Sequence, residues 1–102
     1  MSKKYEIYIG LKDKDTYEEL ITVDEFAKMV EEHCSKKETG FSLSTQVGGY
    51  SHNQGYVTET SLRITLFGID EKDVKELGKV LKEKVNTDTI MITSEDSEHY
   101  YY

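Results

Sequence analysis

Side chains that could contact a ligand gather near the middle of the chain, in the segment Gly48-Gly49-Tyr50-Ser51-His52-Asn53-Gln54-Gly55. Aromatic rings there can stack on a flat ligand, and the imidazole and amide groups can donate and accept hydrogen bonds. Because glycines bound the segment and strand-like runs flank it, we predict a hairpin loop. We expect Tyr50, His52, Asn53 and Tyr56 to contact a small molecule or a protein partner. An ordinary exposed hairpin is the alternative for the same residues.

A single carboxylate, Glu59, interrupts a predicted strand whose other outward residues are Ser, Thr and Arg. A carboxylate at such a position can form an ion pair with Arg63 or with a nearby lysine. It can instead face a ligand or an interface, where it accepts hydrogen bonds or balances a positive charge. Both interpretations stay open, and we include Glu59 in the candidate contact site.

Other kinds of catalytic and metal chemistry find little support in the sequence. The single cysteine, Cys34, cannot form an internal disulfide, and it falls on the apolar stripe of a predicted helix, where an inert thiol is usual. The histidines His33, His52 and His99 fall on a predicted helix, the hairpin and the tail, without the spacing of metal ligands. Because Gly48-Gly49 joins strand to strand rather than strand to helix, it does not predict a phosphate loop. We therefore predict no catalytic residue, no metal and no cofactor.

Hydropathy patterns predict the elements that position these residues. Period-two alternation predicts strands, and apolar residues recurring every three to four positions predict helices. The predicted strands cover residues 5–11, 41–47, 56–67 and 89–93, and the predicted helices lie between 22 and 37 and between 70 and 86. A reciprocal capping box, Thr22 with Glu25, marks the start of the first helix, and Asp70 caps the second. Gly78 lets the second helix approach the sheet closely, and Asn86 suits its C-terminal cap.

Two helices with one apolar stripe each must cover one face of a four-stranded antiparallel sheet. With right-handed crossovers, this order of elements gives an α+β fold, the ferredoxin-like βαββαβ sandwich. We predict one such domain over residues 1–93 and an acidic, then aromatic, C-terminal tail over residues 94–102. The tyrosines of the tail are expected to dock against the same or a neighbouring subunit.

The second face of the predicted sheet is polar but not strongly charged. It would carry Glu6, Tyr8, Ser42, Ser44, Gln46, Glu59, Ser61, Arg63, Thr65 and Met91. Because a sheet face is rarely left bare, we expect a homo-oligomer, either a dimer or a trimer.

The charge balance limits the partners. The chain has 102 residues, of which 20 are acidic and 13 basic, and its formal net charge is −7. An acidic surface repels nucleic-acid phosphates and anionic membranes, so we expect neither as a direct partner. The sequence contains no apolar run of membrane-spanning length and no signal-peptide pattern, so we expect a cytoplasmic protein.

Part of the chain resembles the PII-like signalling superfamily. The resemblance runs from Phe41 through Gly48-Gly49-Tyr50, Gly55 and Leu62 to the second predicted helix and Ile92. It implies a glycine-bearing loop after the second strand and trimers that bind nucleotides or related small molecules between subunits. No Lys or Arg occurs between Lys37 and Arg63, so the basic phosphate-binding residues of that superfamily have no counterpart here.

A second resemblance involves two short runs, Ile7-Tyr8-Ile9-Gly10 and Glu59-Thr60-Ser61-Leu62. They are similar to a bacterial family of uncharacterised small domains with an aromatic-glycine first strand and a Glu-x-Ser third strand. Many members of that family are exported. The family has no assigned activity that could be transferred to this chain.

Three functional hypotheses follow from these patterns. The preferred one is a non-enzymatic binding or regulatory module that acts as a homo-oligomer and contacts a small molecule or a protein through the hairpin. The second is an acidic inhibitor that blocks a nucleic-acid-binding protein, which would need a contiguous acidic face. The third is a dimeric ferredoxin-like enzyme, which would need a polar residue pointing into the core.

Overall fold

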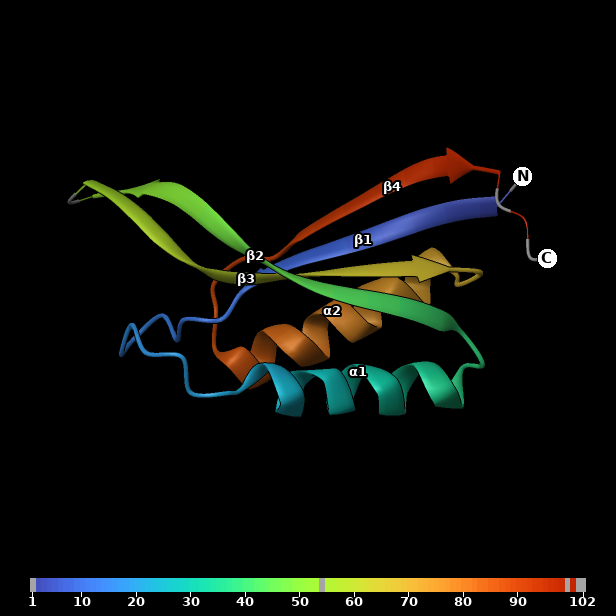
Figure 1. Cartoon of the computed structure of the whole chain (residues 1–102), viewed down its shortest axis with the longest axis horizontal. Coiled ribbons are helices and arrows are strands. Elements are labelled where there is room, and N and C mark those ends of the chain that lie inside the picture. The colour runs from blue at the N-terminus through green and yellow to red at the C-terminus, as the bar shows by residue number, and fades with distance from the viewer. Residues whose placement is uncertain (1, 54, 99, 101–102) are drawn as a thin grey trace.

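The computed structural model describes residues 2–53, 55–98 and 100 of the chain. The elements, in order, are β1 (Ser2–Gly10), α1 (Val23–Lys36), β2 (Gly40–His52), β3 (Gly55–Phe67), α2 (Glu71–Val85) and β4 (Met91–Ser97). The strands form one sheet in the order β2-β3-β1-β4, and every neighbouring pair is antiparallel. Both helices cover the same face of this sheet (Figure 1). The predicted ferredoxin-like α+β fold is confirmed.

Neither helix of the described structure has the length and apolar character needed to cross a membrane.

The core lies between the helices and the covered face of the sheet. Alternate residues of β1 and β3 point into it, and the apolar stripes of both helices close it. Its buried members are Tyr5, Ile7, Ile9, Leu11, Phe26, Val30, Cys34, Leu62, Ile64, Leu66, Val74, Leu77, Leu81 and Val85. The thiol of Cys34 is buried, as predicted, and burial raises its pKa.

The helix ends agree with the predicted caps in part. The hydroxyl oxygen of Thr22 accepts a hydrogen bond from the backbone N–H of Glu25 at 3.1 Å, and the hydroxyl donates to the Glu25 carboxylate at 3.1 Å. The predicted reciprocal box is therefore wrong in one detail, because that carboxylate is bonded to the hydroxyl and not to the Thr22 amide. Asp70 is the N-cap residue of α2, but its side chain makes no capping hydrogen bond, so the predicted side-chain cap is wrong. Asn86 ends α2 in the left-handed conformation, with φ 61°, as expected.

Gly78 allows the close contact that was predicted between α2 and the sheet. A Cβ atom at this position would lie 2.7 Å from Cδ1 of Ile90 and 3.3 Å from Cδ1 of Ile92. The absence of a side chain therefore lets α2 approach the strand that follows it.

The predicted loop over residues 48–55 is wrong, because most of it is strand. β2 continues through both glycines to His52, with the pairings Gly48↔Glu59 and Gly49↔Thr58, and β3 begins at Gly55. Gly49 occurs within the strand because it makes room for a neighbouring ring and not because the chain turns there. A Cβ at this position would lie 2.6 Å from the hydroxyl of Tyr56. The resulting ribbon projects beyond the helices (Figure 1).

The last strand also differs from its predicted bounds. It begins at Met91 and runs to Ser97, so the first four residues of the predicted tail are paired with β1. Ion pairs fasten this part, Lys4 with Glu95 at 2.6 Å and Lys3 with Asp96 at 3.4 Å. Beyond it, Tyr100 is exposed and donates a hydrogen bond to Glu98. The predicted docking of the tail stays a prediction, because His99, Tyr101 and Tyr102 lie outside the described residues.

The uncovered face of the sheet is polar, as expected, and carries a network centred on Glu6. The hydroxyl of Tyr8 donates to Glu6 at 2.6 Å, and Lys4 and Arg63 lie 3.2 and 3.7 Å from the same carboxylate. The Tyr8 hydrogen bond, followed by Lys4 and Arg63, lowers the pKa of Glu6. The same bond raises the pKa of Tyr8, and Glu95 followed by Glu6 raises the pKa of Lys4. Opposite charges therefore balance one another on this face.

The two N-caps give a matched test of the helix starts. Thr22→Ala removes a side-chain cap and is expected to lower the free energy of unfolding by about 1 kcal/mol. Asp70→Ala removes only a favourable charge near the helix N-terminus, so its cost should be about 0.5 kcal/mol. Urea unfolding followed by circular dichroism measures both. Equal losses in the two variants would contradict the assigned cap bonding.

Candidate functional site

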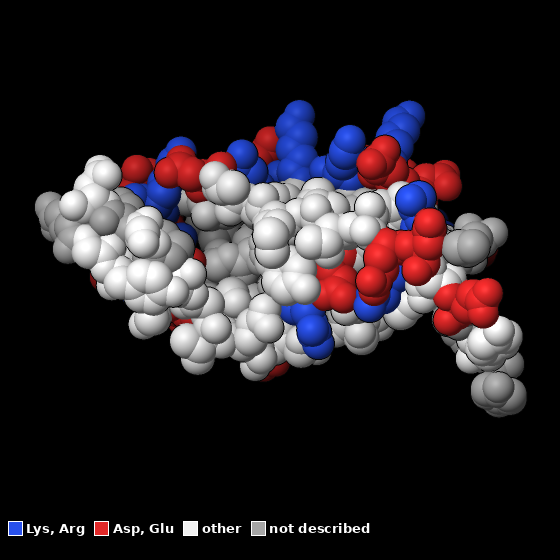
Figure 2. All heavy atoms as spheres, turned by 90° about the horizontal axis from the view of Figure 1, so that it is seen from above, with Lys and Arg blue, Asp and Glu red and all other residues white. Residues whose placement is uncertain are grey.

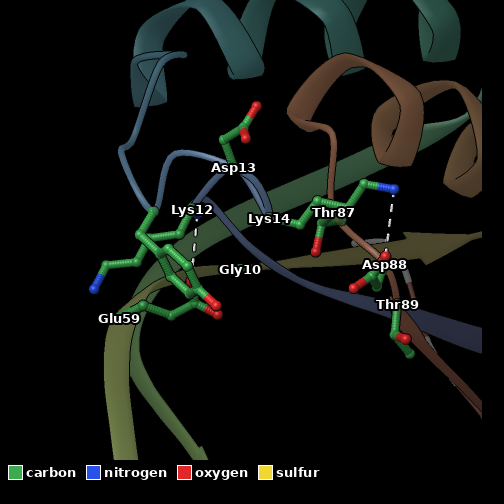
Figure 3. Close-up of a pocket in the computed structure, with 9 residues that line it drawn as sticks. Gly10, Lys12, Asp13, Lys14, Glu59, Thr87, Asp88 and Thr89 are labelled. Atoms are coloured by element: carbon green, nitrogen blue, oxygen red, sulfur yellow. Dashed lines mark hydrogen bonds and ion pairs between the residues drawn. The ribbon is translucent and has the colours of Figure 1, made fainter. Parts of the chain in front are cut away.

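A groove of about 430 Å³ lies where β1 ends, beside the base of the β2–β3 hairpin. Its walls come from three segments: the end of β1 with the following loop, one residue of β3, and the turn between α2 and β4 (Figure 3). The lining residues are Gly10, Lys12, Asp13, Lys14, Tyr17, Glu59, Thr87, Asp88 and Thr89. In the space-filling view the surface is hollowed between the hairpin and the body of the sheet (Figure 2).

Glu59 crosses this groove over the end of β1. Its Oε2 accepts a hydrogen bond from the backbone N–H of Lys12 at 3.3 Å. Gly10 lies directly beneath the carboxylate, and a Cβ at that position would be 2.6 Å from Cδ of Glu59. The absence of a side chain at Gly10 therefore leaves the space that the Glu59 carboxylate occupies.

The Glu59 carboxylate has no ion-pair partner among the described residues. Arg63, one candidate partner, pairs with Glu6 at 3.7 Å, and the ammonium group of Lys12 donates to the carbonyl of Thr58 at 3.4 Å. A half-buried carboxylate with one long backbone hydrogen bond keeps acceptor capacity for another group. The chemistry it can supply is the binding of a cation or of hydroxyl groups.

The loop that forms the second wall is held by Asp13. This buried carboxylate accepts hydrogen bonds from the backbone N–H groups of Asp15 and Thr16, at 2.7 and 3.0 Å, and from the side-chain amide of Asn86 at 3.0 Å. The Asn86 amide, followed by the two backbone donors, lowers the pKa of Asp13. The backbone of Lys14 donates to the Asn86 carbonyl at 2.9 Å. Two distant segments are thereby joined into one wall.

An ion pair ties the rim of the groove. The ammonium group of Lys14 lies 3.4 Å from the Asp88 carboxylate (Figure 3). Both side chains are largely exposed, so the pair contributes little to stability. It nevertheless places a positive and a negative group beside the opening.

The predicted site residues are placed as follows. Glu59 lies in the groove, whereas Tyr56 alternates onto the other face of β3, and Asn53 is exposed at the hairpin turn. The side chains of Tyr50 and His52 lie outside the described part, and their backbones pair with Val57 and Gly55. Three residues lie between Gly55 and Glu59 along β3, so these two positions are about 13 Å apart. The structure therefore brings Glu59 together with the end of β1, and not with the hairpin tip.

Several groove residues were not predicted. Gly10 continues the alternation of Glu6 and Tyr8, which were assigned to the polar face together with Glu59, and this was a usable signal for the contact. No local pattern connects Asp13 with Asn86, which is 73 residues away in the chain. Within the described ranges, no group of three or more His, Cys, Asp or Glu residues is arranged to hold a metal ion.

Comparisons with known proteins bear on the fold. No protein-family model matches the chain, and no curated protein matches its sequence. A solved structure of a phage SAM lyase in complex with S-methyl-5'-thioadenosine matches with a TM-score of 0.74 and 23% identity, over 93% of this chain and 81% of that one. The periplasmic divalent cation tolerance protein CutA from Archaeoglobus fulgidus matches with a TM-score of 0.66 and 11% identity, over 99% and 88% of the two chains. CutA1 from Ehrlichia chaffeensis matches with a TM-score of 0.63 and 12% identity, over 98% and 84%.

At these identities the likeness establishes a shared fold. The chain has the small ferredoxin-like fold that the phage enzyme and the CutA proteins share. The resemblance to the PII-like superfamily stays a prediction, because a match at 11% identity shows the fold alone.

The contact between Gly10 and Glu59 can be tested by adding a methyl group. Gly10→Ala should displace the carboxylate, break its hydrogen bond with the Lys12 amide, and lower the free energy of unfolding by about 0.5–1.5 kcal/mol, the contribution of one hydrogen bond. The matched control is Gly40→Ala, because a Cβ there meets nothing within 4 Å. It should be neutral or slightly stabilising. Urea unfolding and the NMR shift of the Lys12 amide are the measurements, and an unchanged amide shift in Gly10→Ala would contradict the assigned contact.

The lowered pKa of Asp13 predicts that the stability of the fold depends on pH. Because its pKa is lowered in the folded state, ionised Asp13 stabilises the fold above the ordinary carboxyl pKa of about 3.9, and this contribution is lost as the pH falls. The urea midpoint of Asp13→Ala should therefore lie below that of wild type at pH 7, and the difference should shrink near pH 3. Asp15→Ala, which loses one exposed bond to Asn86, should show a smaller difference at pH 7. A difference that is the same at both pH values would contradict the assignment.

Proposed function

We propose that this protein is a small-molecule-binding module whose groove at Glu59 holds a positively charged adenosyl compound, with S-adenosylmethionine as the candidate ligand. The observation that carries the proposal is the Glu59 carboxylate, held over Gly10 without an ion-pair partner in the described structure. A half-buried carboxylate in this state favours a ligand that brings a positive charge or hydroxyl groups.

The groove suits such a ligand in size and charge. Its volume of about 430 Å³ falls within the range of about 300–1,000 Å³ that is usual for small-molecule sites. S-adenosylmethionine combines a sulfonium cation, a ribose diol and an amino acid carboxylate. Glu59 can balance the positive charge of the first and accept hydrogen bonds from the second, and Lys12 is a basic residue of the lining that can pair with the third.

Similarity to solved structures supports this choice of ligand. The phage SAM lyase covers nearly the whole of this chain, and its structure holds S-methyl-5'-thioadenosine, which shares the adenosyl group with S-adenosylmethionine. The ligand proposal transfers that chemistry to the Glu59 groove. We propose this ligand rather than a nucleotide, because the acidic chain would repel the phosphates of a nucleotide.

The finer parts of the proposal concern assembly and the hairpin. We propose a homo-oligomer of cytoplasmic location, in which Tyr50, His52, Asn53 and Tyr56 contact a ligand or a neighbouring subunit. Since the hairpin tip is about 13 Å from Glu59, one chain does not offer all five residues to one small ligand. A neighbouring copy is the simpler partner for the tip.

A second candidate function is cleavage of S-adenosylmethionine. The substrate's own carboxylate can attack the γ-carbon, so that the bond between this carbon and sulfur breaks, S-methyl-5'-thioadenosine leaves with the electron pair, and the other product is a lactone. Such a step needs mainly a placed substrate and a suitable electrostatic environment. The unpaired Glu59 carboxylate is the specific feature that favours this candidate. The acidic-inhibitor hypothesis has less support, because acidic and basic side chains are interspersed on the face seen in Figure 2.

The binding proposal is tested with S-adenosylmethionine itself. Isothermal titration calorimetry should show binding by wild type, and Glu59→Gln should weaken it at least about 10-fold, the effect of losing one charge-assisted interaction. Glu32→Gln makes the same change of charge on the exposed surface of α1 and should bind as wild type does. No binding by wild type, or equal binding by Glu59→Gln, would overturn the proposal.

The same samples separate binding from cleavage. Mass spectrometry after incubation should detect S-methyl-5'-thioadenosine with wild type and much less with Glu59→Gln, if the second candidate is correct. Binding without any product would leave the binding module in place and eliminate the lyase.

A further inference from the structure

One wall of the groove belongs to a short hairpin formed by residues 12–19, between β1 and α1. An isolated antiparallel bridge joins its two ends, and the backbone N–H of Asp13 donates to the Glu18 carbonyl at 2.9 Å. At the tip, the backbone N–H of Tyr17 donates to the Asp13 carbonyl at 2.8 Å. Because these bonds close the segment along its length, the backbone of Tyr17 has a fixed position beside the groove.

Tyr17 has a backbone conformation that a bulky side chain rarely adopts. Its φ is 59°, in the left-handed region, which costs free energy for a residue with a Cβ atom. Two other described non-glycine residues share this conformation, Glu38 and Asn86, and both lie where a helix ends, which is its usual place. Tyr17 instead lies before either helix begins. Residues held in such conformations cluster at ligand-binding sites, so this outlier points to a function of the ring.

Tyr17 is also the aromatic member of the groove lining. The other lining residues that the structure describes are a glycine, two lysines, three acidic residues and two threonines. Tyr17 alone therefore supplies a ring or a large apolar surface. It is 51% exposed, although an aromatic side chain gains free energy when it is buried. A flat ligand group placed against this ring buries surface that the protein itself leaves open.

We propose that Tyr17 recognises the base of the ligand, because its ring stacks on the flat heterocycle of an adenosyl compound. The inference rests on the proposed function, in which Glu59 interacts with the sulfonium and the ribose and Lys12 with the carboxylate. Those contacts leave the adenine without a partner, and stacking on an aromatic side chain is a common way in which proteins hold a base. Tyr17 thereby makes the groove selective for sulfonium compounds that carry a nucleoside.

A contact between the Tyr17 ring and the sulfonium cation is the competing interaction, and two probes separate it from stacking on the base. S-methyl-5'-thioadenosine carries the base without the positive charge. S-methylmethionine carries the sulfonium and the amino acid group without the base. Wild type should bind S-methylmethionine at least about 10-fold more weakly than S-adenosylmethionine, since it lacks the stacked base.

In isothermal titration calorimetry, Tyr17→Asn should weaken the binding of S-adenosylmethionine and of S-methyl-5'-thioadenosine at least about 10-fold. Asparagine is chosen because it tolerates the left-handed conformation, so the variant should keep the native circular dichroism. Tyr17→Phe keeps the ring and should bind both ligands as wild type does. Leu20→Asn removes another exposed apolar side chain of the same loop, 58% accessible and outside the groove lining, and should also bind as wild type does.

Unchanged binding of S-methyl-5'-thioadenosine by Tyr17→Asn would overturn the role of this ring. Equal affinities of wild type for S-adenosylmethionine and S-methylmethionine would overturn it without any variant. Both results leave the binding of S-adenosylmethionine, and thus the proposed function, in place. Wild type that binds S-methyl-5'-thioadenosine but not S-adenosylmethionine, with the expected loss in Tyr17→Asn, would refute the sulfonium ligand and support the role of Tyr17. Binding of neither compound would refute both proposals.

Discussion

The burial of β1 is the constraint on which the rest of the structure depends. This strand lies between β3 and β4, and Tyr5, Ile7 and Ile9 are at most 5% exposed beneath the two helices. Burying one such side chain contributes about 1.5–3 kcal/mol, so the strand cannot shift its register without losing the core. Since its alternate residues must face outward, Gly10 lies on the polar face at the point where Glu59 crosses. The position of the groove thus follows from the packing of the core.

Much of the fold could be predicted because its signals are local. The alternation in β1, the apolar stripes of both helices, the Thr22 cap and the left-handed Asn86 cap each depend on a few neighbouring residues. The hairpin could not be predicted in this way. A glycine that supplies a positive φ, such as Gly55 at 130°, looks the same in sequence as one that makes room for a ring, such as Gly49. The turn signals therefore led to the prediction of a loop where six described residues, 48–52 and Gly55, are strand.

In the candidate site too, a residue with a local signal was predicted and a contact between distant residues was not. Glu59 stood out because a carboxylate was unexpected among its strand neighbours, and the structure places it in the groove. The wall formed by Asp13 gave no signal, because its partner is supplied by the end of α2. Single residues of such a site can be predicted from the sequence. The shape of the site cannot, because it depends on contacts between distant segments of the folded chain.

Asn86 also connects the groove to the order in which the chain folds. It ends α2 and, through its amide, holds Asp13 from 73 residues earlier. Contacts between distant residues form late, because closing a long loop costs conformational entropy. During synthesis, the β2–β3 hairpin and β1 can pair before α2 has emerged from the ribosome. The loop over residues 11–20 takes its final shape only after the last turn of α2 has formed, so the groove is completed when nearly the whole chain has been made.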